Sequence, residues 1–137
     1  MFALINSDNM NIPNGHQIVM PYLMLDNAFK FIDFTKEVFN AELTTNMHQL
    51  RPDGKSVLHS EVRIGGCTIM FSDVSEQWKK QTANLFVYVE DADTTYSKAI
   101  LAGAETLMGL SDQSYGRTCG VTDPFGNVWW ITSANRQ

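Results

Sequence analysis

The sequence predicts an α+β protein made of two paired βαβββ modules, and three observations lead to this prediction. Each half of the chain reads in the same order: strand, Asp, helix, Ala-Glu, strand, strand, Gly, strand. Ala41 and Ala104, which close the two helices, are separated by the same number of residues as Leu23 and Phe86. Each half is too small to bury both faces of its own sheet, so the halves must pair. The alternative is two unrelated α+β halves.

The first module is predicted to begin after a flexible leader, residues 1–15, which is polar and Asn-rich. Residues 17–25 are nearly all apolar and predict a strand. Pro21 cannot donate to a ladder, so this strand should lie at a sheet edge or carry a bulge. Asp26 or Asn27 is expected to cap a helix that ends near Asn40. Its buried stripe is predicted to be Ala28, Phe31, Ile32, Thr35 and Phe39.

Three strands are predicted to complete this module, over residues 41–47, 56–64 and 67–71. Their β-branched and alternating apolar residues suit a sheet, and turn-forming Pro-Asp-Gly and Gly-Gly sequences separate them. Residues 73–82 are mostly polar and are expected to connect the two modules.

The second module is predicted to repeat this plan from residue 84 onward. Residues 84–89 predict a strand, and Asp91 or Asp93 is expected to cap a helix. The predicted stripe of this helix is Ala92, Tyr96, Ala99, Ile100 and Gly103. Strands are expected at residues 105–110, 117–122 and 128–132, with a loop over residues 111–116.

Composition narrows the classes of function. The chain has 137 residues, 44% of them hydrophobic, and a net charge of −5 without a basic run. This argues against a nucleic-acid or anionic-membrane surface, and no apolar run approaches the length of a membrane span. The two cysteines, Cys67 and Cys119, have no metal-binding spacing, and no secretory signal is visible. We therefore expect reduced thiols and a cytoplasmic protein.

The C-terminal motif Asp123-Pro124-Phe125-Gly126-Asn127, followed by Val128-Trp129-Trp130, resembles the end of a vicinal-oxygen-chelate domain. This superfamily contains glyoxalase I, bleomycin resistance proteins and extradiol dioxygenases. Within it, the motif of this chain is most similar to the sequences of the PhnB-like branch. Further matches are Pro21-Tyr22-Leu23, residues 59–66, residues 69–73 and Tyr115-Gly116-Arg117. The resemblance implies one domain over residues 16–137, with modules at about 16–73 and 83–134. It also implies a curved mixed sheet around a cavity, and a homodimer.

The resemblance also identifies the positions where metal-dependent relatives place their ligands. These are Val19, Met70, Asn84 and Trp130 in this sequence. Divalent ions prefer carboxylate, imidazole or amide oxygen, which these four side chains barely supply. We therefore expect no metal and no cofactor.

His59 and Glu61 offer another route to a metal, because alternate residues of a strand point to the same face. A metal there would need further ligands, such as His48 or Asp123. With Arg63, the pair also fits a solvated or cross-strand-paired face, or the wall of a ligand cavity. His16 and His48 show no partner in the sequence and are expected at the surface.

Adjacent residues of a strand face opposite sides, so one of Trp129 and Trp130 should pack in the core. The resemblance makes Trp130 the cavity residue, either as a plug in the former metal site or as a wall that stacks on a planar ligand. Trp78, in the polar connector, is interpreted as a lid, a dimer contact or a simple exposed ring. Arg117, beside Tyr115 and Gly116, would either clamp an anion or form a salt bridge at the rim.

Three hypotheses of function remain from the sequence. The first is a metal-free protein that binds and sequesters a planar or apolar small molecule. The second is a metal-dependent lyase, isomerase or dioxygenase, and the third is an interaction module with a filled cavity. The predicted ligand-binding residues are Trp130, His59, Met70, Asn84, Glu61, Trp78, Tyr115 and Arg117.

Overall fold

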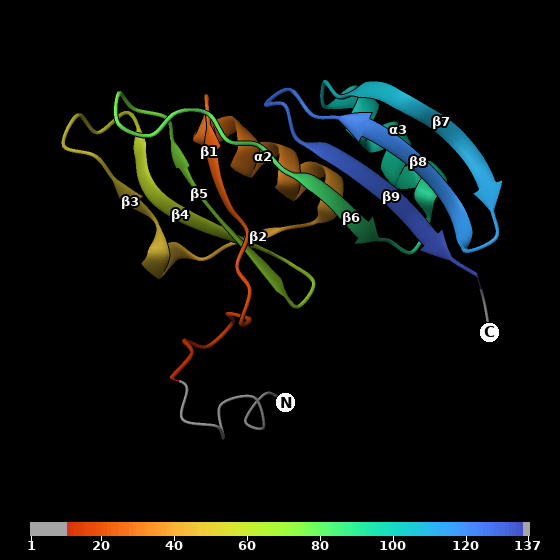
Figure 1. Ribbon diagram of the computed structural model, residues 1–137, viewed down its shortest axis with the longest axis horizontal. Coiled ribbons are helices and arrows are strands. Elements are labelled where there is room, and N and C mark those ends of the chain that lie inside the picture. The colour runs from red at the N-terminus through yellow and green to blue at the C-terminus, as the bar shows by residue number, and fades with distance from the viewer. Residues whose placement is uncertain (1–10, 136–137) are drawn as a thin grey trace.

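The computed structural model describes residues 11–135 as two βαβββ-like modules placed side by side (Figure 1). The N-terminal module contains β1 (Tyr22–Leu25), α2 (Ala28–Phe39), β2 (Glu42–Leu43), the 3-10 turn η1 (Thr45–Met47), β3 (Gln49–Leu50), β4 (Val57–Ile64) and β5 (Cys67–Asp73). The C-terminal module contains β6 (Asn84–Tyr88), α3 (Ala92–Leu101), β7 (Glu105–Gln113), β8 (Gly116–Thr122) and β9 (Val128–Ala134).

Each module forms its own mixed sheet. The N-terminal order is β1-β5-β4-β2, with β3 also paired to β4, and the C-terminal order is β6-β9-β8-β7. In both sheets the first strand runs parallel to the last strand of its module, and the other pairs are antiparallel. The predicted α+β class and the two modules are confirmed. The strands divide into two sheets, one per module.

The first helix follows the prediction. Asn27 caps α2, because its side chain accepts a hydrogen bond from the backbone of Lys30. Asn40 ends the helix in the left-handed region at φ 57°. All five residues of the predicted stripe are buried.

The second helix departs from the prediction on its buried side. Asp91 caps α3 as expected, by accepting hydrogen bonds from the backbone of Asp93 and Thr94. The buried residues are Ala92, Thr95 and Ala99. Ile100 and Gly103, which were predicted to be buried, are exposed, and Tyr96 is half-buried, because the apolar stripe of this short helix is too weak to orient it.

Two strand predictions and one loop prediction were also wrong in extent. Residues 41–47 form a two-residue strand followed by a 3-10 turn, and the predicted strand over residues 17–25 is regular only from Tyr22 to Leu25. The expected loop at residues 111–116 is mostly strand, because β7 and β8 form a long hairpin. Polar residues such as Ser111 and Asp112 suit the exposed edge strand that β7 becomes.

Aromatic side chains join the two modules. Phe39 at the end of α2 lies against Trp129 of β9, with ring centroids 4.5 Å apart. Phe125, in the turn before β9, makes edge-on contacts with Phe31 and Phe34 of α2. The helix of the first module therefore packs on the second module of the same chain. Both helices lie behind the sheets in Figure 1, which leaves the opposite sheet faces without a helical cover.

Asp123 holds the turn that carries the family resemblance. Its buried carboxylate accepts hydrogen bonds from the backbone of Phe125 and Asn127, and from the side chains of Asn127 and Trp129. Burying a carboxylate is costly without such partners, so this residue serves the fold. It is not available as a metal ligand.

Neither helix in residues 11–135 is long and apolar enough to cross a membrane. Cys67 and Cys119 are both free thiols, the first exposed and the second buried.

Candidate functional site

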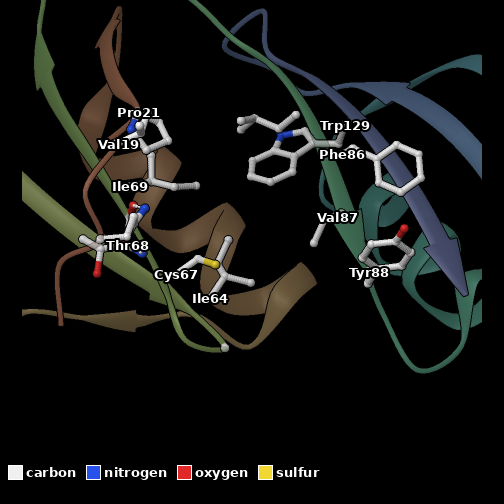
Figure 2. A pocket seen from close by; sticks show the side chains of 13 residues that line it. Val19, Pro21, Ile64, Cys67, Thr68, Ile69, Phe86, Val87, Tyr88 and Trp129 are labelled. Carbon is white, nitrogen blue, oxygen red and sulfur yellow. Dashed lines mark hydrogen bonds between the residues drawn. The ribbon is translucent and has the colours of Figure 1, made fainter. Parts of the chain in front are cut away.

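A cavity of about 440 Å³ lies where the two modules meet. Figure 2 shows Val19, Pro21 and Ile69 of the N-terminal module on one side and Val87, Tyr88 and Trp129 of the C-terminal module on the other. The full lining is Gln17, Val19, Pro21, Ile64, Gly65, Cys67, Thr68, Ile69, Leu85, Phe86, Val87, Tyr88 and Trp129. This volume is within the range of small-molecule sites.

The topology explains why a cavity forms at this place. β1 and β6 are the edge strands of their sheets, and they do not pair with each other. Pro21 precedes β1 and has no N–H to donate, which blunts that edge. Residues from both faces of β6 reach the cavity. Its lining therefore combines partly buried side chains that pack against the core, such as Leu85, with exposed ones, such as Tyr88.

An aromatic surface continues from this cavity over the open face of the C-terminal sheet. Phe86 and Tyr88 line the cavity, and their ring centroids are 5.2 Å apart. Tyr115, in the β7–β8 turn, lies 6.2 Å from Phe86. Trp130 is the register partner of Phe86 on β9. We call these four residues the aromatic shoulder.

Trp129 is buried beneath α2, so one of the two tryptophans packs in the core as predicted. Trp130, which was predicted to face the cavity, faces the open side of the sheet and does not line the cavity between the modules. The indole N–H of Trp130 donates to the side-chain oxygen of Asn84. The ring lies across Gly120 of β8, where a Cβ atom would collide with it. Trp130 is only half-buried, so it does not fill a closed core.

The eight ligand-binding residues predicted from the sequence lie in several places, and none of them lines the cavity between the modules. Trp130, Asn84 and Tyr115 belong to or adjoin the aromatic shoulder. His59, Glu61 and Met70 lie together on the open face of the N-terminal sheet. Trp78 lines a separate depression beside Tyr22.

Arg117 lies on the helix side of β8, where it pairs with Asp93 of α3 at 2.9 Å and with Asp112 at 3.3 Å. Its hydrogen bonds to Asp93 lower the pKa of that carboxyl and raise the pKa of the guanidinium. Of the two interpretations of Arg117, the structure gives the salt bridge at the rim.

The open face of the N-terminal sheet carries a hydrogen-bonded network around Glu61. The carboxylate is only 1% exposed and accepts from His16 at 2.7 Å and from His59 at 2.9 Å. The other ring nitrogen of His59 bonds to the Tyr22 hydroxyl at 2.8 Å. Burial, followed by the Glu61 charge, raises the pKa of Tyr22. A solvated strand face is therefore wrong for this pair.

Residues 15–17 cover this network. The backbone oxygen of Gly15 accepts a hydrogen bond from the Thr68 hydroxyl, and the Gln17 side chain makes two more with the backbone of Thr68. His16 was expected at the surface, but its side chain is nearly buried against Glu61. His48, also expected at the surface, bonds to Ser60. Of the predicted leader, residues 1–10 lie outside the described part of the chain.

The ligand positions of metal-dependent relatives do not fit a metal here. Met70 pairs with Tyr22 in the first module, and Trp130 pairs with Phe86 in the second, so Tyr22 corresponds to Phe86. Asn84 lies two residues before Phe86, and its counterpart is therefore Met20. The predicted position, Val19, was wrong by one residue. Neither residue is a ligand for a hard ion. Both oxygens of Glu61 already bond to histidines, and in residues 11–135 no three His, Cys, Asp or Glu side chains converge to hold a metal.

The sequence predicted a cavity, but apart from Val19 it missed the residues that line it, because they are ordinary apolar residues. Leu85, Val87 and Ile69 read as strand core, and only their place at the junction makes them a wall. One signal was present: Pro21 predicted that the first strand lies at an edge, and edges are where the modules meet.

Comparison with known proteins is consistent with this geometry. The family model "Glyoxalase/Bleomycin resistance protein/Dioxygenase superfamily" matches residues 16–131. The uncharacterized protein Rv0887c of Mycobacterium tuberculosis is 34% identical, and the match covers 95% of this chain and 81% of that protein.

Two solved structures share the fold at low identity. TnmS3, an antibiotic binding protein from Streptomyces sp. CB03234, superposes with a TM-score of 0.66 at 18% identity, over 93% of this chain and 100% of that one. The PhnB protein from Bacillus cereus, titled a putative 3-demethylubiquinone-9 3-methyltransferase, gives 0.67 at 19% identity, over 86% and 100%.

Proposed function

Because this chain belongs to the glyoxalase/bleomycin resistance protein/dioxygenase superfamily, and because an apolar cavity separates its two modules, we propose that it binds and sequesters a small planar or apolar molecule without a metal. The ligand lies between Ile69 and Val87 and extends over the aromatic shoulder. The branch of the family is PhnB-like, a proposal that the Bacillus cereus structure supports.

The observation that carries this proposal is the lining of the cavity. It is dominated by aliphatic and aromatic side chains, and it contains no Asp, Glu, Lys, Arg or His. Such a site gains affinity by removing apolar ligand surface from water, at about 25 cal/mol per Å² before the costs of binding. Among the side chains used in general acid–base catalysis, the cavity wall offers only the Cys67 thiol and the Tyr88 phenol.

The neighbouring aromatic shoulder favours a planar ligand. Phe86, Tyr88 and Tyr115 are all half-exposed or more, although exposed aromatic clusters are unusual on a surface without a partner. Stacking on such rings adds about 0.5–1.5 kcal/mol beyond area burial. That TnmS3 is an antibiotic binding protein on the same fold agrees with a binding role.

The test is titration with N-phenyl-1-naphthylamine, a neutral planar probe that fluoresces in apolar surroundings. We expect saturable binding to one site per chain. Val87→Arg places a charge in the cavity wall and should weaken the affinity by at least tenfold. The matched control is Leu101→Arg, on the exposed surface of α3, which should bind the probe as the parent does.

Trp130→Ala tests the contribution of the aromatic shoulder to probe binding separately from that of the cavity. If the probe extends over the shoulder, its affinity should fall about three- to tenfold, the loss of one stacked ring. Circular dichroism checks that the parent protein and Val87→Arg are both folded. If the probe then binds both proteins with equal affinity, the proposed site is contradicted.

We also propose that the protein is a cytoplasmic homodimer. The open aromatic face supports the dimer, because a second copy would cover it. Analytical ultracentrifugation at several concentrations tests this.

A further inference from the structure

A second cavity, of about 290 Å³, lies in the N-terminal module near the connector. Its lining is Tyr22, Met24, Arg51, Leu58, Ser72 and Trp78. It shares no residue with the cavity between the modules, so it is a separate site. We propose that it binds a small organic anion, a carboxylate or sulfonate on a planar apolar body.

Three large apolar side chains converge here in exposed positions. Trp78 is 55% exposed, Leu58 is 48% exposed and Tyr22 is 43% exposed. Single exposed apolar residues are common on proteins, but three around one depression mark a binding surface. The walls therefore fit a planar apolar group.

Two of these walls are held in place by hydrogen bonds. The Tyr22 hydroxyl bonds to His59, which bonds to the buried carboxylate of Glu61. The backbone N–H of Trp78 bonds to the Ser75 hydroxyl, and its carbonyl accepts from the Ser75 backbone. A site that is already ordered loses less entropy when a ligand binds.

Arg51 supplies the charge. Its guanidinium donates to the backbone carbonyls of Asp73 and Val74, at 2.7 and 3.2 Å, which fixes its position. Two of its five N–H donors are used in this way, and the others remain for a ligand. Planar guanidinium groups bind carboxylates and sulfonates with paired hydrogen bonds.

No carboxylate of residues 11–135 forms an ion pair with Arg51. The Asp73 carboxylate accepts from the backbone of Ala28 and Val57. Exposed Asp53 accepts hydrogen bonds from the backbone of Lys55 and Ser56, and these bonds, followed by the more distant charge of Arg51, lower its pKa. A half-buried cation beside an apolar depression thus has no partner of opposite charge in the described chain. Since the net charge of the protein is −5, general attraction of anions is not expected.

The experiment compares 1-naphthalenesulfonate with the neutral 1-naphthalenesulfonamide, followed by quenching of tryptophan fluorescence. We expect the sulfonate to bind at least tenfold more tightly, with an affinity that falls as salt is added. Arg51→Gln should remove this preference and leave the sulfonamide unchanged. The matched control is Arg63→Gln, on the same sheet but away from this depression, which should keep the preference.

Arg51 also ties the turn after β3 to the end of β5, so Arg51→Gln removes two structural hydrogen bonds as well as the charge. Trp78→Phe therefore provides an independent reading: it should abolish the quenching while circular dichroism stays unchanged. Val87→Arg, which blocks the cavity between the modules, should leave sulfonate binding intact, so this site can succeed or fail apart from the proposed function. Equal affinities for the two probes, or loss of both in Val87→Arg, would overturn the proposal.

Discussion

The central rows of the two sheets occupy the same place in the repeat but differ in chemistry. In the N-terminal module the row is Tyr22, Met70 and Glu61, and in the C-terminal module it is Phe86, Trp130 and Gly120. The first row centres on a buried carboxylate bonded to two histidines. The second centres on an indole ring that lies over a glycine.

The two rows are also covered differently. Residues 15–17 of the chain itself cover the first row, whereas the second row remains open. In the N-terminal module an internal polar network therefore occupies the centre of the sheet face, whereas in the C-terminal module the centre of this face is apolar and open. A duplicated fold preserves backbone pairing, while the side chains on each face determine what each copy does.

The largest expected effect distinguishes the two sides of β9. Trp129→Ala should reduce the free energy of unfolding by about 3–5 kcal/mol, because it empties a core site that is 1% exposed. Trp130→Ala, next to it, should cost about 1 kcal/mol, the size of its hydrogen bond to Asn84. Urea unfolding followed by circular dichroism measures both, and similar losses would contradict the assignment of the two faces.

The polar row of the N-terminal module is tested by Glu61→Gln. A neutral amide cannot accept from both histidines as the carboxylate does, so we expect a loss of about 1–3 kcal/mol. The segment over this face should also loosen, and proteolysis near residue 15 should become faster. Unchanged stability together with unchanged proteolysis would mean that the network does not hold the segment.

The aromatic row is tested by a matched pair of glycines. Gly120→Ala places a methyl group against the Trp130 ring and should cost about 1–3 kcal/mol, because the indole must move. Gly66→Ala, in the N-terminal module, meets no atom within 4 Å and should change stability by less than about 0.5 kcal/mol. Thermal unfolding of both variants gives the comparison, and equal effects would place Trp130 elsewhere.

The smallest expected effect is a difference in reactivity between the two thiols, which is measured without any substitution. Burial raises the pKa of Cys119 to about 11, so this thiol stays protonated and unreactive at pH 8. Cys67 at the start of β5 is exposed and should react. A colorimetric disulfide reagent should therefore count one thiol per folded chain and two in guanidinium. Two thiols in the folded protein would show that the C-terminal module opens.

Much of the fold could be predicted from the sequence because the signals were local. The sequence predicted two candidate caps for each helix, and the structure has one of each pair, Asn27 and Asp91, in that role. Register was harder: Leu23 was aligned with Phe86, but pairing shows that Tyr22 occupies that place. A slip of one residue moves a side chain to the other face, which also explains the error at Val19.

The candidate site was less predictable because it depends on contacts between distant segments. Strand alternation predicted that Trp129 and Trp130 face opposite sides, and the family resemblance indicated that Trp130 is the one outside the core. The bond between His16 and Glu61, in contrast, joins residues far apart in the chain. The cavity between the modules depends on how two sheets meet, which no local pattern encodes. Arg51, similarly, lies just before the predicted Pro-Asp-Gly turn and was not predicted as a site residue.

The central claim, that the cavity between the modules binds a small apolar molecule, is tested most directly at Cys67, which lines it. In a Cys119→Ala protein, the rate of Cys67 labelling is measured with and without saturating N-phenyl-1-naphthylamine. We predict that the bound probe slows labelling at least tenfold and that Val87→Arg abolishes this protection. An unchanged rate with the probe fully bound would contradict the claim and move the ligand out of this cavity.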